Sequence, residues 1–132
     1  MLILLVNHAV LADEDAHLID HVIRQQWQKP GIKLEIAPVV VEGHYAIAGW
    51  VLGERGGRAL LRRGDHGWEV FMCGGDDLSK PYVLQQSGIE ARAATLLVQK
   101  LIAAEQLMSP AARKQFSIFE GVVPVSSQQH AY

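Results

Sequence analysis

The chain has a single cysteine, few aromatic residues and no large excess of either charge. Cys73 has no partner for an internal disulfide, so packing has to hold the fold together. A net charge of −2 with scattered basic residues excludes the strongly basic surface typical of nucleic-acid-binding proteins. The composition is that of an ordinary soluble protein: 132 residues, of which 49 % are apolar, fit one domain with its own core.

Motifs typical of enzymes are also missing. The sequence contains no G-x-S-x-G, no phosphate-binding loop and no metalloprotease helix, and the glycines of GERGGR (53–58) lack the spacing of a dinucleotide site. A cysteine nucleophile needs a histidine base, but His66 lies about 20 Å from Cys73 along a straight strand, which leaves only His44 to approach across a sheet. We therefore predict that the protein is not an enzyme, with reductase-like or hydrolytic chemistry at Cys73 as the alternative.

The chain opens with an apolar run, MLILLVNHAVLA, followed at once by charged residues. Val10 and Ala12 stand where a signal-peptidase site has its small residues, so we interpret residues 1–12 as a shortened signal segment cleaved before Asp13. The alternative is a short buried strand, and the run is too short to span a bilayer. Residues 13–125 are then one α+β domain, and residues 126–132 a loose tail.

The first half of this domain predicts a helix and an antiparallel meander. Residues 13–29 carry apolar side chains on one side at helical spacing, begin with an acidic turn and end at Pro30-Gly31. Four strand-like runs follow, at 33–42, 44–54, 58–63 and 68–73. Their short glycine-bearing connections favour hairpins, so we expect antiparallel pairing of 44–54 with 58–63 and of 58–63 with 68–73. Pro38 places the first run at an edge or at a bulge.

The second half predicts helices and a last extended segment. Ser79 and Pro81 open a short helix that Gly88 closes, residues 89–108 form a long helix, and Ser109-Pro110 begin a third. The stretch FEGVVPV (119–125) is expected to be extended. The fold class is therefore α+β: an N-terminal helix packed on a four-stranded antiparallel meander, then C-terminal helices and a short last strand, with the helices on one face of the sheet.

One histidine pair and two sulfur side chains are the candidate metal ligands. His17 and His21 are four residues apart on the polar face of the first helix, so both imidazoles can reach one copper or zinc ion. Cys73 is either a copper(I) ligand or a packed thiol, and we expect it to share a strand face with Phe71. Met72 is a further soft donor, but it points to the opposite face from Cys73 unless a bulge intervenes.

Charged neighbours argue against a reactive thiol. The carboxylates of Asp76 and Asp77 disfavour the thiolate and hence a nucleophile, whereas a bound metal would displace the proton. Arg58 and Arg62, in the one basic cluster, share a strand face and are predicted to lie at a solvated edge.

Two longer stretches, AGWVLGERGGRALLRRGDHGWEVFMCGGDDL (48–78) and FSIFEGVVPV (116–125), resemble the copper uptake system-associated proteins of proteobacteria. RGGRALLRR followed by CGGD is the most specific part, and the likeness spans most of residues 35–125. The matching positions are Trp50, Gly53, Arg55, Gly56, Gly57, Arg58, Ala59, Leu60, Leu61, Trp68, Cys73, Gly75, Asp76 and 116–123. The resemblance implies an exported, periplasmic protein with a part in copper handling and with copper transport proteins as partners.

Residues and resemblance together predict a periplasmic accessory protein of a copper uptake system, which binds copper transiently or contacts a transporter. Copper(I) shared between two Cys73 thiols would make it a homodimer. We expect no nucleic-acid partner and at most peripheral membrane contact. The alternative is a ligand- or protein-binding module with a cystatin-like or NTF2-like helix-on-sheet architecture and an open sheet face.

Overall fold

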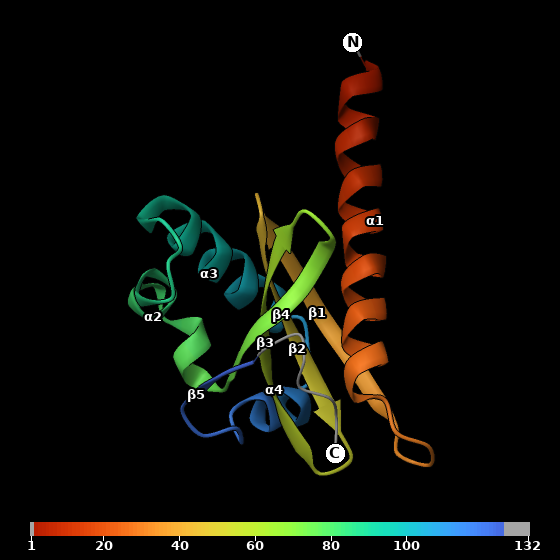
Figure 1. The fold of residues 1–132 in the computed structure, drawn as a ribbon, viewed down its shortest axis with the longest axis vertical. Coiled ribbons are helices and arrows are strands. Elements are labelled where there is room, and N and C mark those ends of the chain that lie inside the picture. The colour runs from red at the N-terminus through yellow and green to blue at the C-terminus, as the bar shows by residue number, and fades with distance from the viewer. Residues whose placement is uncertain (1, 126–132) are drawn as a thin grey trace.

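A computed structural model of the chain describes residues 2–125, with the side chains of residues 2–12 excepted. The predicted order of elements and the α+β class are confirmed (Figure 1). The elements are α1 (Leu2–Trp27), β1 (Leu34–Glu42), β2 (Tyr45–Leu52), β3 (Arg55–Gly64), β4 (Gly67–Gly74), a 3-10 turn (Asp76–Ser79), α2 (Pro81–Gln86), α3 (Ala91–Glu105), α4 (Pro110–Phe116) and β5 (Val122–Pro124). The predicted loose tail, 126–132, lies outside the described residues.

The five strands form one sheet in the order β1-β2-β3-β4-β5, and every neighbouring pair is antiparallel. Both predicted hairpins are confirmed, since Tyr45 pairs with Arg62 and Arg58 pairs with Gly74. Gly53, in the β2–β3 turn, has a φ of 62°, a left-handed conformation that glycine adopts without a Cβ clash. The last extended segment is β5, which pairs with the end of β4.

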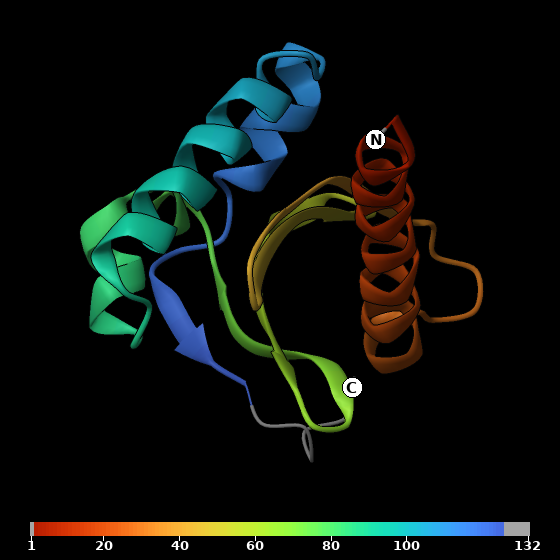
Figure 2. The same cartoon turned by 90° about the horizontal axis from the view of Figure 1, so that it is seen from above.

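Helices cover both faces of the sheet, so the prediction of helices on one face only is wrong. The sheet is strongly curved: α1 lies on its concave side, whereas α2, α3 and α4 lie on its convex side (Figure 2). Two apolar cores result, one under α1 and one under α3. Residues 46–49 and 56–61 are accordingly buried without alternation, as in strands that are covered on both faces.

Helix α1 begins earlier than predicted. It runs without a break from Leu2, so both the start at Asp13 and the alternative of a short N-terminal strand are wrong. The apolar side is as predicted, with Ile19 and Ile23 buried. Asp15 therefore lies in the middle of the helix and not in its first turn. Its carboxylate accepts hydrogen bonds from the Trp68 indole and from Arg63. None of the helices within residues 2–125 has the length and apolar character to cross a membrane.

Proline marks both edges of the sheet. Pro38 lies in edge strand β1, after a cis peptide bond, where the register shifts between Ile36 and Val39, so both parts of the prediction for Pro38 are confirmed. Pro124 lies in the opposite edge strand, β5. Because proline has no N–H to donate, both edges are poorly suited to pairing with a strand from another molecule.

Candidate functional site

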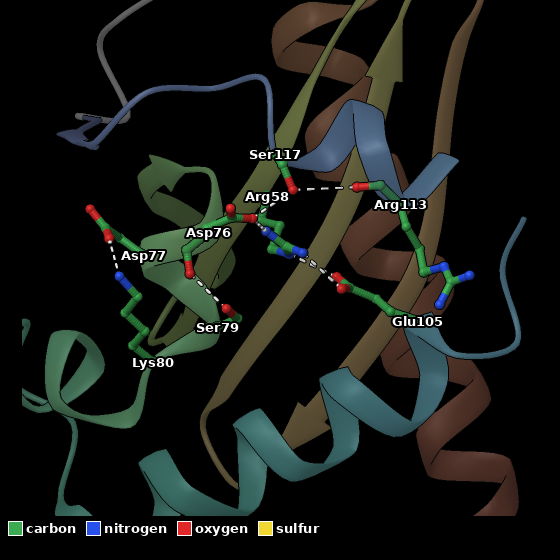
Figure 3. A network of polar contacts seen from close by, with 8 residues as sticks. All are labelled: Arg58, Asp76, Asp77, Ser79, Lys80, Glu105, Arg113 and Ser117. Atoms are coloured by element: carbon green, nitrogen blue, oxygen red, sulfur yellow. Dashed lines mark hydrogen bonds and ion pairs between the residues drawn. The ribbon is translucent and has the colours of Figure 1, made fainter. Parts of the chain in front are cut away.

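A buried arginine lies where the C-terminal helices meet the sheet. Arg58 comes from β3 and is only 4 % exposed. Its Nε and Nη2 atoms donate hydrogen bonds to the two carboxylate oxygens of Glu105, at the end of α3, both at 2.7 Å (Figure 3). The prediction of a solvated edge for Arg58 is therefore wrong, because β3 is the central strand and its convex face is covered. Arg62 does remain at the surface, paired with Glu69 at 2.8 Å.

The third guanidinium nitrogen joins this pair to two further segments. Arg58 Nη1 donates to Asp76 Oδ1 at 3.4 Å, and Ser117 Oγ, just after α4, donates to the same oxygen at 2.6 Å (Figure 3). The ring of Phe116 lies 5.7 Å from the guanidinium carbon. Burial alone would lower the pKa of Arg58, but the hydrogen bonds and charges of Glu105 and Asp76 outweigh burial and raise it.

The charge of Arg58 is neutralised within this network. Each of the three guanidinium nitrogens of Arg58 donates one hydrogen bond to a carboxylate, so the buried positive charge is paired with Glu105 and Asp76. Throughout the part of the chain that the structure describes, every fully buried side-chain nitrogen or oxygen has a hydrogen-bond partner. The arrangement fixes β3, α3, the 3-10 turn and the end of α4 to one another, and its role is structural.

Glycines around Arg58 allow the C-terminal segment to lie directly on the sheet. A Cβ at Gly56 would collide with the carbonyl of Gln115, and a Cβ at Gly75 with the carbonyl of Phe119. Gly75 also donates its N–H to the carbonyl of Gly121 at 3.4 Å. Gly57 and Gly74 are similarly crowded. A Cβ added at Gly57 would lie 3.0 Å from Phe119 Cβ, and one added at Gly74 would lie 3.0 Å from Gly121 O. The glycines of RGGR and CGGD thus make room for residues 115–121.

Cys73 packs in the concave core, under α1, and is 9 % exposed. Met72 packs against the convex core, so the prediction that the two sulfur side chains point to opposite faces is confirmed. Phe71 lies on the same side as Met72, and the prediction that it shares a face with Cys73 is wrong. The reason is a bulge: Met72 pairs with Leu60, but Val70 pairs with the next residue of β3, which leaves Phe71 unpaired and reverses the alternation.

The histidines near the meander lie at the far end of the sheet from Cys73. Cys73 pairs with Ala59 and Val123, close to the end of β4. His66 occupies the β3–β4 turn, and the His44 carbonyl accepts a hydrogen bond from Arg63 N in the same region. Neither imidazole is brought to the thiol. In residues 13–125, no three His, Cys, Asp or Glu side chains are close enough to hold a metal ion together.

His17 and His21 lie on α1 with both side chains exposed, as predicted. The neighbouring carboxylate of Asp20 is occupied by Arg24, with Nε and Oδ1 2.7 Å apart. The two imidazoles therefore stand apart from both cores and from the Arg58 network.

A shallow hollow of about 390 Å³ opens on the convex side, between α2 and β5. Its lining is mixed and comes from Met72, Asp77, Tyr82, Val83, Gln86, Ser87 and Val122. Asp77 is bound to Lys80 at 3.1 Å. Of the predicted metal ligands only Met72 reaches this hollow, and Cys73 does not.

Sequence reasoning missed the Arg58–Glu105 pair, although a signal existed. Glu105 continues the buried stripe of α3 four residues after Leu101, and Arg58 stands within the buried run of β3. Two opposite charges inside two apolar patterns indicate a buried ion pair, since an unpaired buried charge is costly.

Comparisons of this chain with protein-family models, with curated proteins and with solved structures find no match.

The thiol of Cys73 is expected to be unreactive in the folded protein. Burial raises its pKa from 9.0 to about 12. At pH 8 the folded protein then holds about a thousandfold less thiolate than an unfolded chain, so iodoacetamide should label it slowly, and rapidly only in denaturant. Between pH 9 and 12 the unfolded thiol ionises first, so stability should fall as pH rises through this window. Equally fast labelling with and without denaturant would contradict the burial.

Proposed function

We propose that this protein is a non-enzymatic accessory component of a periplasmic copper uptake system, and that it acts by contacting a copper transport protein rather than by holding copper(I) at Cys73. The copper role comes from the resemblance to the copper uptake system-associated proteins. The preference for contact comes from the surroundings of the thiol.

One observation carries the proposal: the segments that bear the resemblance meet in space. RGGR lies in β3, CGGD ends β4, and residues 116–123 lie against both. Arg58 binds Asp76, Gly75 binds Gly121, and Cys73 pairs with Val123. Motifs far apart in the sequence are expected to converge in this way if the resemblance reflects a shared folded unit rather than separate chance matches.

The sulfur chemistry favours contact over chelation. A copper(I) site needs at least two soft donors, and Met72 points away from Cys73. The histidines His44 and His66 lie at the other end of the sheet, and the thiol itself is protonated and enclosed. Copper(I) at Cys73 would require the concave core to open.

The alternative of a binding module with an open sheet face receives less support. Helices cover both faces of the sheet, so neither face is open to a partner (Figure 2). The surfaces that remain for a partner are the outer sides of the helices and the hollow beside Tyr82. Tyr82 is 58 % exposed there and offers an apolar ring with a hydrogen-bonding hydroxyl.

The proposal is tested by the copper content of copper-limited cells that lack the gene. We expect less cellular copper than in the parent strain, with recovery on expression of either the wild-type protein or Cys73→Ala, because the thiol acts in packing. Mass spectrometry of washed cells gives the copper content, and iron and zinc contents are the controls. An unchanged copper content without the gene would contradict the copper role. Failure of a folded Cys73→Ala variant to restore copper would instead favour a thiol ligand.

A further inference from the structure

We infer that His17 and His21 form a copper(II) site on the exposed side of α1. Helix α1 is continuous on both sides of the pair. Because the helix runs from Leu2 to Trp27, the pair lies well inside it rather than in a fraying first turn. Side chains four residues apart in a helix lie one above the other on the same face, about 5–6 Å apart at Cβ, which suits two imidazoles on one ion.

The helix that carries the pair is fixed to the rest of the protein. Ile19 and Ile23 are buried in the concave core at 0 % and 2 % exposure. Asp15, on the same helix, binds Arg63 at 3.1 Å and the Trp68 indole at 3.2 Å. The two imidazoles are therefore presented on a backbone whose opposite side is anchored, so little conformational freedom is lost when a metal binds.

Both imidazoles are free to bind. His17 and His21 are exposed, and neither makes a hydrogen bond or ion pair with any residue that the structure describes. The carboxylate of Asp20, between them in sequence, is held by Arg24 at 2.7 Å and 3.5 Å. The site therefore consists of two neutral nitrogen donors, with water completing the coordination, and should exchange its ion readily.

This donor set selects copper(II) among the common divalent ions. Imidazole suits copper, zinc and nickel, and at a site of fixed ligands copper(II) binds most tightly in the divalent series. In the part of the chain whose side chains are described, no cysteine or methionine accompanies the pair on α1, which makes it a poor copper(I) site. Copper(II) binding by this pair does not depend on the proposed cellular role, and it would give the chain an exposed metal site that does not involve the buried Cys73.

The test is a titration of the purified full-length protein with copper(II) chloride, followed by calorimetry and electron paramagnetic resonance. His17→Gln and His21→Gln should each lower the affinity roughly tenfold or more, since losing a ligand costs at least as much as losing an outer-shell partner. His66→Gln, an exposed histidine in the β3–β4 turn, is the matched control and should bind like the wild type.

A relocated pair tests the spacing itself. Gln25 is exposed and lies four residues after His21. Adding Gln25→His to His17→Gln should therefore restore tight binding, whereas His17→Gln alone should not. Copper(II) should also raise the melting temperature of the wild-type and His66→Gln proteins, because it binds the folded helix, but not that of the His17→Gln/His21→Gln double variant. Unchanged copper(II) affinity in the double variant, or failure of Gln25→His to restore binding, would overturn the site.

Discussion

Replacement of Arg58 by alanine should destabilise the protein by about 3–5 kcal/mol, because it leaves the carboxylate of Glu105 buried without its partner. Glu105 is 8 % exposed and receives two 2.7 Å hydrogen bonds from the guanidinium. The same change also removes the contact that ties Asp76, and through it Ser117, to the sheet. Urea unfolding followed by circular dichroism measures the loss.

Arg62→Ala is the matched control for this experiment. Arg62 lies on the same strand and also pairs with a glutamate, Glu69, but the pair is exposed and the guanidinium lies 4.9 Å from the ring centre of Phe71. Its loss should cost about 1 kcal/mol. The double variant Arg58→Met/Glu105→Leu should be more stable than Arg58→Ala, since no buried charge remains unpaired. Equal losses for Arg58→Ala and Arg62→Ala would show that burial of the pair does not matter.

Gly75→Ala should also be strongly destabilising, by about 3 kcal/mol or more, because the new methyl group would overlap the carbonyl of Phe119 and no flexible side chain can give way. The expected response is that residues 115–121 lift off the sheet. Val125, whose N–H donates to the Phe71 carbonyl at 2.9 Å, should then exchange its amide hydrogen faster than in the wild type. Urea unfolding and hydrogen exchange give the two readouts.

Gly64→Ala is the control for crowding. Gly64 is exposed at the end of β3, and a Cβ there would meet nothing within 4 Å. Its substitution should change stability by no more than about 0.5 kcal/mol. An equally small loss of stability for Gly75→Ala and Gly64→Ala would contradict the close contact between Gly75 and residues 115–121. The glycines of CGGD would then not be needed to make room for that segment.

Local patterns in the sequence determined most of the elements and the pairing of β2, β3 and β4. Short glycine turns predicted the hairpins of β2, β3 and β4, Pro38 predicted an edge or a bulge, and Ser109-Pro110 predicted the start of α4. These signals could be read because they act within a few residues, through φ preferences, missing N–H groups and capping hydroxyls. Ser109 does accept a hydrogen bond from Ala112 N at 3.2 Å. The apolar side of α1 was readable for the same reason.

The candidate site was only partly readable. The exposure of His17 and His21 follows from helical periodicity, and the opposite directions of Met72 and Cys73 follow from strand geometry. The side on which Phe71 packs did not follow, because a one-residue bulge in β4 reverses the alternation without any local mark in the sequence. The register of the sheet decides which of Phe71, Met72 and Cys73 lies on the concave face, under α1.

Only the tertiary structure decided that helices cover both faces of the sheet and that Arg58 meets Glu105. The two charges are 47 residues apart. Their contact depends on how α3 lies across the convex face, which no short-range preference specifies. The burial of Cys73 under α1 likewise depends on the curvature of the whole sheet. Apart from the first turns of α1, the sequence by itself determined which segments are helices and strands, because backbone preferences are local. The fold alone decided which charges and thiols are buried, because burial is set by contacts between distant segments.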